Sequence, residues 1–289
     1  MSGPLFANAL VSGLLLAGFY AAVSVGISIA FGMLDVVNIA HPAFIVLGSY
    51  AASVANGALG VDPILTAVLL SPAFFVLGLA LYRLYYASFE RRGREPLRGL
   101  AFFFGILFVT EVALILAFGV DYRSVSTRYI DTTWRFGAID LPLRLFIPFA
   151  VSLVMTLALK ASLSRTFFGR AVLAVGQDQL ALQLMGVDPI RIKQLAFGIS
   201  IATAGVAGAL LVVIQPVQPS LGREYIGLVF AIPVLGGLGS IGGTLAGAAI
   251  LGIATSFTAT FFGPSWAPAV SFGVLLLALA VRPSGLFGR

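Results

Sequence analysis

The stretch KASLSRTFFGRAVLAVGQDQLALQLMGVDPIRIKQ, residues 160–194, decides how the chain is read, because it is the longest soluble-looking piece in an otherwise apolar sequence. Small and apolar residues recur through it at helical spacing as far as Met185. Gly186 then suits a helix C-terminus, and Asp188-Pro189 suits the cap and first turn of another helix. The pattern predicts helix, glycine stop and new helix. It is either a solvated linker or, as we favour, an element that presents a short helix to a soluble partner.

Composition defines the class of protein. Of 289 residues, 60% are hydrophobic and only 10% are charged, whereas soluble domains carry about a quarter charged residues. This composition predicts a polytopic membrane protein. The net charge of +6 does not indicate nucleic-acid binding, because the Lys and Arg residues form no continuous stripe. The absence of cysteine excludes disulfides, zinc-thiolate sites and cysteine catalysis.

We expect an all-α bundle of eight or nine spans, since about 20 apolar residues cross a bilayer as helix. The expected apolar segments are 5–34, 42–55, 63–86, 100–120, 145–159, 195–214, 225–236, 244–262 and 266–281. Segment 42–55 is short and follows a polar interruption, Asp35 to Pro42, which suggests a broken or partly re-entrant helix. Counted as a crossing it gives nine spans and an external N-terminus, which we favour. Otherwise there are eight spans and an internal N-terminus. The first Lys or Arg is Arg83, so the first segment lacks the basic start of a cleavable signal peptide and is expected to stay as a span.

Basic loops assign the two sides of the membrane. The first charged loop has five arginines (Arg83, Arg91, Arg92, Arg94 and Arg98) against Glu90 and Glu95. Residues 160–194 contain Lys160, Arg165, Arg170, Arg191 and Lys193. The positive-inside rule therefore places both loops in the cytoplasm. Residues 121–144, with four arginines and three aspartates, are more nearly balanced and are expected outside.

A glycine-rich interruption separates two of the later spans. Gly237, Gly239 and Gly242 have the spacing of a dinucleotide fingerprint, but they lie between membrane segments rather than in a strand-helix-strand unit. Together with Gly236 they predict a glycine-packed turn or a helix break whose backbone lines a cavity.

Three polar residues within apolar sequence are further pathway candidates. Asn38 and His41 lie three residues apart, on one helical face, and Glu111 lies inside a span, where a charge is expensive. Each has a structural alternative: the first two as a polar pair satisfying backbone groups at a helix break, the glutamate as a protonated or paired side chain. A lone histidine rules out a multi-histidine metal site, and no serine-acid arrangement suggests a catalytic triad. Arg223 and Glu224 are expected to be an exposed pair worth little.

The chain contains no Gly-x-x-x-x-Gly-Lys-Ser/Thr sequence. It therefore cannot supply its own P-loop ATPase, and a pump built on it needs a motor from another subunit.

Four stretches resemble one family, in the family's order. Gly169-Arg170-Ala171, Gln177-Asp178, Ala181 and Gly186 resemble the coupling loop of ABC-importer permeases of the branched-chain amino acid (Liv-type) family. The stretches VLGGLGSIGG at 234–243 and VRPSGLFGR at 281–289 are similar to family segments. Asn38-Ile-Ala-His-Pro42 resembles the family's Asn-x-Ala-His-Gly, with Pro42 in the glycine position. This proline puts backbone-mediated roles there in doubt.

The resemblance implies a single transmembrane permease domain over residues 1–289, with multiple passes through the cell's inner membrane and a coupling loop at 160–194. It implies ATP-binding cassette subunits docked on the cytoplasmic side, a second permease subunit, identical or different, and an external binding protein. ATP would be bound by the partners, so the chain needs no cofactor and is not itself an enzyme. The coupling residues would be Gly169, Arg170, Gln177, Asp178, Ala181 and Gly186.

The implied activity is ATP-driven alternating access for hydrophobic, branched-chain amino acids. Urea or short amides are alternative cargoes that the residues do not separate from amino acids. A different class is an ion- or proton-coupled secondary transporter working alone, for which Glu111 with Asp35 offers few of the ionisable groups a relay needs. A non-transporting membrane scaffold is a third alternative.

Overall fold

The described structure is built almost wholly from helices, which confirms the all-α prediction. A computed structural model describes residues 3–92 and 96–287. The predictions for Arg94, Glu95, Gly288 and Arg289 lie outside the described residues. The helices are α1 (Gly3–Ala30), α2 (His41–Leu59), α3 (Pro63–Ser88), α4 (Pro96–Phe118), α5 (Leu143–Arg165), α6 (Phe167–Val175), α7 (Gln179–Leu184), α8 (Pro189–Ile214), α9 (Leu221–Gly236), α10 (Ile241–Phe261) and α11 (Ala267–Val281), with 3-10 turns at Glu90–Arg92 and Pro264–Trp266.

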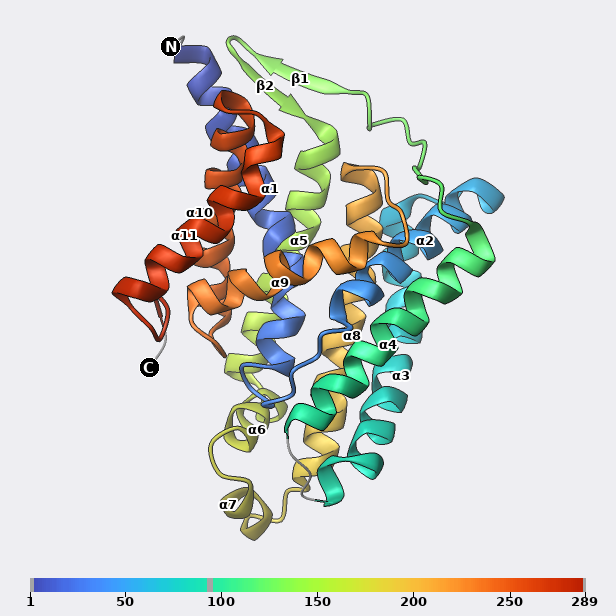
Figure 1. Ribbon diagram of the computed structural model, residues 1–289, viewed down its shortest axis with the longest axis vertical. Helices are drawn as coiled ribbons and strands as arrows, with labels where there is room; N and C mark the ends of the chain where they lie inside the picture. Colours follow the sequence, from blue (N-terminus) through green and yellow to red (C-terminus); the bar gives the residue numbers. More distant parts are fainter. Residues whose placement is uncertain (1–2, 93–95, 288–289) are drawn as a thin grey trace.

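Eight helices in the described part of the chain are long and apolar enough to cross a membrane. The segment expected at 42–55 is among them, because α2 continues to Leu59 and has 19 residues. The short element is instead α9, with 16 residues, and Figure 1 shows it running across the direction of the long helices. The favoured expectation that segment 42–55 crosses the membrane is therefore supported, whereas the expected ninth span, 225–236, is not among the eight.

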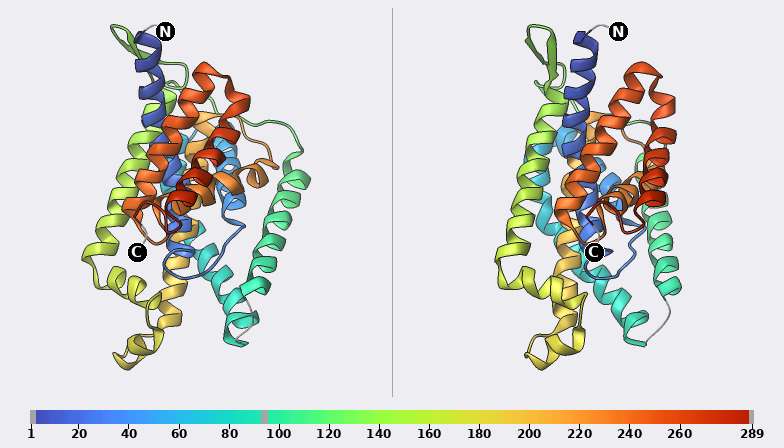
Figure 2. Two further views of the ribbon diagram at one scale, coloured as in Figure 1. Left: turned by 60° about the vertical axis from the view of Figure 1, so that its left-hand side comes forward. Right: turned by 90° about the vertical axis from the view of Figure 1, so that its left-hand side faces the viewer.

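The two ends of the bundle differ. The N-terminal end of α1 lies at one end, beside a β-hairpin, whereas α6 and α7 project from the opposite end (Figures 1 and 2). The end of α3 and the start of α4, which flank the first basic loop, lie at the α6–α7 end. The two loops that the charge pattern assigned to one side therefore do lie at one end of the bundle. We call the two ends the hairpin end and the α6–α7 end.

Helices α1 and α8 form the centre, and small residues let their neighbours approach closely, as is usual in membrane bundles. Serine hydroxyls bridge the helices there. The Ser200 hydroxyl donates to the Gly26 carbonyl over 2.7 Å, and the Ser49 hydroxyl donates to the Gly208 carbonyl over 2.7 Å. In an apolar medium such bonds satisfy polar groups that have no water molecules to bond with. They fix how α1 and α2 sit against α8.

The hairpin between α4 and α5 was not anticipated. Its strands, β1 (Thr133–Phe136) and β2 (Ile139–Pro142), pair antiparallel. Asn8 of α1 holds it, donating to the Ala138 carbonyl over 3.1 Å and accepting from the Asp140 amide over 2.8 Å. In the same connection, burial and a hydrogen bond to Asp62 raise the pKa of the Tyr129 phenol, which therefore stays protonated and donates to that carboxylate.

Candidate functional site

The segment between α5 and α8 folds as its capping residues dictate. The Thr166 hydroxyl accepts from the Gly169 amide over 3.0 Å and starts α6. The Asp178 carboxylate accepts from the Ala181 amide over 2.9 Å and starts α7. Gly186 has φ +78°, the left-handed conformation predicted for a helix stop. The Asp188 carboxylate then caps α8 through the Ile190 amide, 2.9 Å away.

One part of the prediction for this segment was wrong. A single helical run to Met185 was expected, but α6 ends at Val175 and α7 begins at Gln179. The break has two causes. Gly176 packs directly on the Met33 carbonyl oxygen, which leaves no room for a side chain, and the Asp178 cap satisfies the amides of a new helix rather than continuing the old one. Helix α5 ends, and helix α8 begins, inside residues 160–194, so Lys160 and Gln194 are helical.

The six predicted coupling residues occupy this α6–α7 segment (residues 166–188) in two different ways. Gly169 is buried against the backbone of Leu163, where α6 turns back on α5. The other five, Arg170, Gln177, Asp178, Ala181 and Gly186, are exposed. Three apolar side chains of the segment are exposed as well: Leu180 (66%), Leu184 (82%) and Met185 (78%). Because α7 projects beyond the end of the bundle, these residues form an apolar tip suited to a protein partner.

The glycine break was predicted at residues 236–243, and in the structure residues 237–240 join α9 to α10. Gly236 contacts the Gly243 carbonyl so closely that a side chain at either position would overlap the other's backbone. Gly237 and Gly239 have positive φ, at +99° and +79°. Gly242 lies in the first turn of α10, beyond the break, next to the Lys160 ammonium.

The C-terminal motif, residues 281–289, supplies hydrogen bonds to the end of α9 at the glycine break. The Leu286 amide donates to the Leu235 carbonyl over 2.9 Å, and the Phe287 amide donates to the Gly236 carbonyl over 3.0 Å. Carbonyls at the end of α9 therefore gain partners that their own helix does not supply. Two of the stretches that carry the family resemblance are thus one structural unit.

A cavity of about 530 Å³ connects this break with the α6–α7 segment. It is lined by Gly32 and Met33 after α1, by Gly176 and Gln177 between α6 and α7, and by Gly239 and Phe287. Gly239 also packs on the backbone of Gly32. Movement of the α6–α7 segment would therefore act directly on the places where α1 ends and where α9 passes into α10.

The second interruption, residues 35–40 between α1 and α2, is polar rather than glycine-rich. Asn38 and His41 are fully buried, and their side-chain nitrogens and oxygens make no hydrogen bond to the described part of the protein. Pro42 lies in the first turn of α2, where a missing amide hydrogen costs nothing. The structural alternative, in which Asn38 and His41 satisfy backbone groups at the break, is not seen among the described residues.

Glu111 is one partner of an ion pair within the bundle. Its carboxylate lies 2.9 Å from the Arg223 guanidinium of α9, and the Glu111 side chain is 8% exposed. The Arg223 guanidinium also lies over the Phe108 ring. The expected Arg223–Glu224 pair was wrong, because the arginine reaches across to α4. This pair fastens α4 to the crossing helix.

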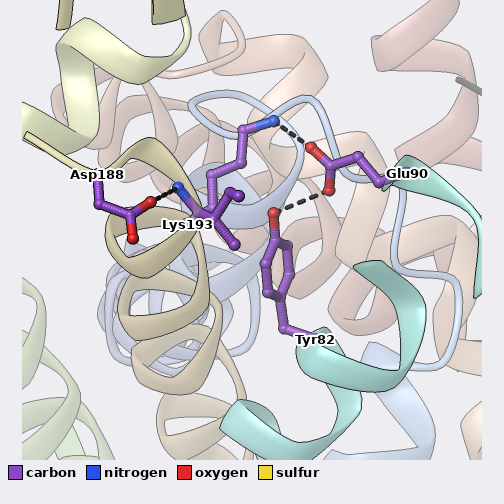
Figure 3. Close-up of polar contacts among 5 residues, drawn as sticks. Tyr82, Glu90, Asp188 and Lys193 are labelled. Carbon is purple, nitrogen blue, oxygen red and sulfur yellow. Dashed lines mark hydrogen bonds and ion pairs between the residues drawn. The ribbon is translucent and has the colours of Figure 1, made fainter. Parts of the chain in front are cut away.

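Sequence reasoning missed a buried polar cluster at the start of α8, which follows the α6–α7 segment along the chain. The Lys193 ammonium lies 2.6 Å from one oxygen of Glu90, and the Tyr82 hydroxyl donates to the other oxygen over 2.8 Å (Figure 3). The Lys193 side chain is 7% exposed. Both charges had been read only as topology signals in loops. The cluster ties the start of α8, just after the Asp188 cap, to the end of α3.

The residues predicted for the substrate pathway are not all brought together. The connection after α1 touches the glycine break where Gly239 packs on the backbone of Gly32. Ala43, at the start of α2, instead lies against Gly222, at the opposite end of α9 from that break. Glu111 lies apart on α4, where its carboxylate pairs with Arg223. Within residues 3–92 and 96–287, no group of three His, Cys, Asp or Glu side chains gathers that could hold a metal ion.

Interrupted helices that meet inside an apolar bundle define a multi-pass membrane protein of the transporter class. The chain belongs to the family described as branched-chain amino acid transport system / permease component, whose model matches residues 9–279. The transport-permease reading of the sequence is confirmed at this level.

Individual relatives cover nearly the whole chain. It is 29% identical to the high-affinity branched-chain amino acid transport system permease protein BraD of Pseudomonas aeruginosa, over 97% of this chain and 95% of BraD. It is 28% identical to the corresponding LivH of Escherichia coli, over 98% and 96%. Similarity extends to LivM of Escherichia coli, at 27% identity over 92% of this chain and 67% of LivM. No solved structure matches the chain.

Proposed function

We propose that this chain is the membrane-spanning subunit of an ATP-driven importer of branched-chain amino acids. The observation that carries the proposal is the α6–α7 segment. It projects from the basic end of the bundle, exposes an apolar tip at Leu180, Leu184 and Met185, and shares a cavity with the glycine break. With no P-loop sequence in the chain, ATP must be bound by partner subunits that dock on this tip.

The geometry suggests how such a motor would act. Closure of the ATP-binding subunits would displace the α6–α7 segment, and the Lys193–Glu90–Tyr82 cluster would carry that displacement into α3 and α8. Gly239 lines the same cavity as Gln177, so displacement of the α6–α7 segment would also shift the ends of α1 and α9. Alternating access then amounts to switching the interrupted segments between two packings.

Further partners follow from the family. The names of LivH and LivM describe permease proteins of one kind of transport system, and both resemble this chain, which supports a second permease subunit beside it. A binding protein would deliver solute at the hairpin end, since the basic end faces the cytoplasm by the positive-inside rule. The complex would reside in the inner membrane, and the chain would need no cofactor of its own.

Two other functions remain as outcomes of a test. A secondary transporter needs free ionisable groups within the membrane, but Glu111 is engaged by Arg223. A scaffold needs no contact with a motor. Uptake of leucine into vesicles separates the three: the importer requires ATP and ATP-binding subunits, the secondary transporter works with an ion gradient alone, and the scaffold gives no uptake.

The sharpest single change is Gly186→Leu. A leucine cannot adopt φ +78° without a cost of about 1–2 kcal/mol, yet no atom lies within 4 Å of the position to be displaced. We expect the bundle to fold and ATP-driven uptake to fall at least tenfold as the end of α7 changes direction. Gly186→Asn is the matched control, since asparagine tolerates the left-handed conformation. Equal uptake and equal recovery of ATP-binding subunits with both variants would contradict the proposed docking role.

A further inference from the structure

A pocket of about 260 Å³ lies among α1, α9, α10 and the start of α11, in the half of the bundle toward the hairpin end. Its wall is mainly apolar and includes Leu228, Ala231 and Phe272. Three groups supply polarity: the Glu224 carboxylate, the Tyr20 phenol, and the hydroxyl pair of Thr255 and Ser271, whose oxygens are 3.0 Å apart. Ligand pockets commonly combine an apolar wall with few polar groups in this way.

A wider, more open cavity of about 700 Å³ adjoins this pocket. Glu224 and Tyr225 line both. The outer cavity is rimmed by Gln215 and Gln218 in the connection between α8 and α9, and the Gln215 amide donates to the Tyr225 hydroxyl over 2.9 Å. A solute arriving at the hairpin end therefore meets Glu224 as it passes from the open cavity into the pocket.

The carboxylate at this junction forms no ion pair within the part of the chain that the structure describes. Its neighbour in sequence, Arg223, points to the other side of α9 and is held by Glu111. Glu224 is exposed, and its carboxylate lies where the open cavity adjoins the mainly apolar pocket. Its negative charge favours a cationic group there, and a solute with both charges would place its ammonium toward Glu224 and its carboxylate toward the water of the open cavity.

We propose that the Glu224 pocket binds solutes that carry a primary ammonium group on a short, branched apolar body. The ammonium donates to the Glu224 carboxylate, and the apolar body packs against Leu228, Ala231 and Phe272. A volume of about 260 Å³ suits a small solute and lies near the lower end of ligand pockets in general. The inference rests on the proposed importer function, and it assigns the imported solute a binding site beside the first turn of α9.

Two analogues of leucine test the chemistry. Isopentylamine keeps the ammonium and the branched body, whereas 4-methylpentanoate keeps the body and the carboxylate. Binding of tritiated leucine would be measured on the permease with its co-purifying subunits in phosphatidylcholine and phosphatidylglycerol nanodiscs. We expect competition by isopentylamine and about tenfold weaker competition, or none, by 4-methylpentanoate.

Glu224→Gln removes the charge while keeping the shape. We expect leucine binding to weaken about tenfold or more and the preference for isopentylamine to disappear. Asp140→Asn in the exposed hairpin is the matched control for loss of one negative charge, and it should bind as the unmodified protein does. Phe272→Ala, which widens the pocket at a half-exposed ring, should raise the ratio of phenylalanine to leucine binding.

The outcomes separate this site from the wider function. Absence of leucine uptake and binding in the unmodified complex would overturn the proposed function as well. Normal leucine binding by Glu224→Gln, with unchanged competition by the two analogues, would overturn the Glu224 site alone. Adding phosphatidylethanolamine tests the other source of a primary ammonium. If that lipid abolishes leucine binding by the unmodified protein, the pocket is a headgroup site and the solute assignment is overturned.

Discussion

The two interruptions in the helical bundle are built in opposite ways. The glycine break, residues 237–240, consists of backbone packed on backbone, and the C-terminal motif supplies hydrogen bonds to the Leu235 and Gly236 carbonyls. The polar break, residues 35–40, has Asp35 at φ +58°, and Asn38 and the adjoining His41 are buried with no side-chain hydrogen bond to the described residues. One break is satisfied and closely packed, whereas the other holds polar groups at a cost in free energy.

This difference indicates a division of labour. Closely packed backbone resists change and transmits displacement, which suits a break that shares a cavity with the α6–α7 segment. Buried polar groups without partners destabilise the conformation that holds them. We infer that the polar break gains hydrogen-bond partners at another stage of transport, and that the glycine break drives the exchange between stages.

The largest expected effect is at the glycine break. Gly236→Leu places a side chain against the Gly243 carbonyl, which belongs to the backbone and cannot rotate away. We expect a loss of about 3 kcal/mol or more in stability, seen as poor recovery of monodisperse protein on size exclusion in detergent.

Gly105→Leu in α4 is the control, because no atom lies within 4 Å of a Cβ added there. Its recovery should match that of the unmodified protein. If Gly236→Leu is recovered equally well, the glycine break is looser than its contacts indicate, and the contrast with the polar break fails.

An intermediate effect is expected at Lys193, which is buried like Asn38 but has a partner. Lys193→Met removes the ammonium from the Glu90 carboxylate, which keeps its hydrogen bond from the Tyr82 hydroxyl. Because Glu90 is 26% exposed, water compensates in part, and we expect a loss of about 1–3 kcal/mol, measured as a lower melting temperature. ATP hydrolysis should also become less tightly linked to uptake.

The double variant Lys193→Met with Glu90→Gln should recover part of the lost stability, since no uncompensated charge is left. A double variant less stable than Lys193→Met alone would show that the ion pair is not the main interaction of this lysine.

The smallest effect on stability is expected at the polar break. Asn38→Leu removes side-chain atoms that make no hydrogen bond, so stability should stay within about 0.5 kcal/mol of the original or increase. Leucine uptake should nevertheless fall, because we expect the amide to be needed at another stage of transport.

Asn56→Leu supplies the comparison. Its amide donates to the Val61 carbonyl over 3.1 Å, and its carbonyl oxygen accepts from the Ser126 amide over 3.1 Å. Loss of those bonds should cost about 1–2 kcal/mol. Equal destabilisation by Asn38→Leu and Asn56→Leu would mean that Asn38 has partners in the folded state, and the inferred division of labour would be wrong.

Local signals in the sequence predicted much of this molecule. Length and apolarity identified eight of the nine expected spans, because a bilayer demands both from every helix that crosses it, and the short segment 225–236 is not among the eight. Gly186 and the Asp188 cap were predicted correctly, since a left-handed residue and an N-cap depend on a few adjacent residues. The break at Gly176 was missed, because its cause is contact with Met33, far away in the chain.

The sequence by itself determined the membrane class and the shared end of the two basic loops, because these depend on composition and on local patterns. Only the tertiary structure decided the pairing of Glu111 with Arg223, the burial of Lys193 against Glu90, and the pocket beside Glu224. The physical reason is that a charge acquires its role from the groups that surround it. In this chain those groups come from helices separated by tens to more than a hundred residues.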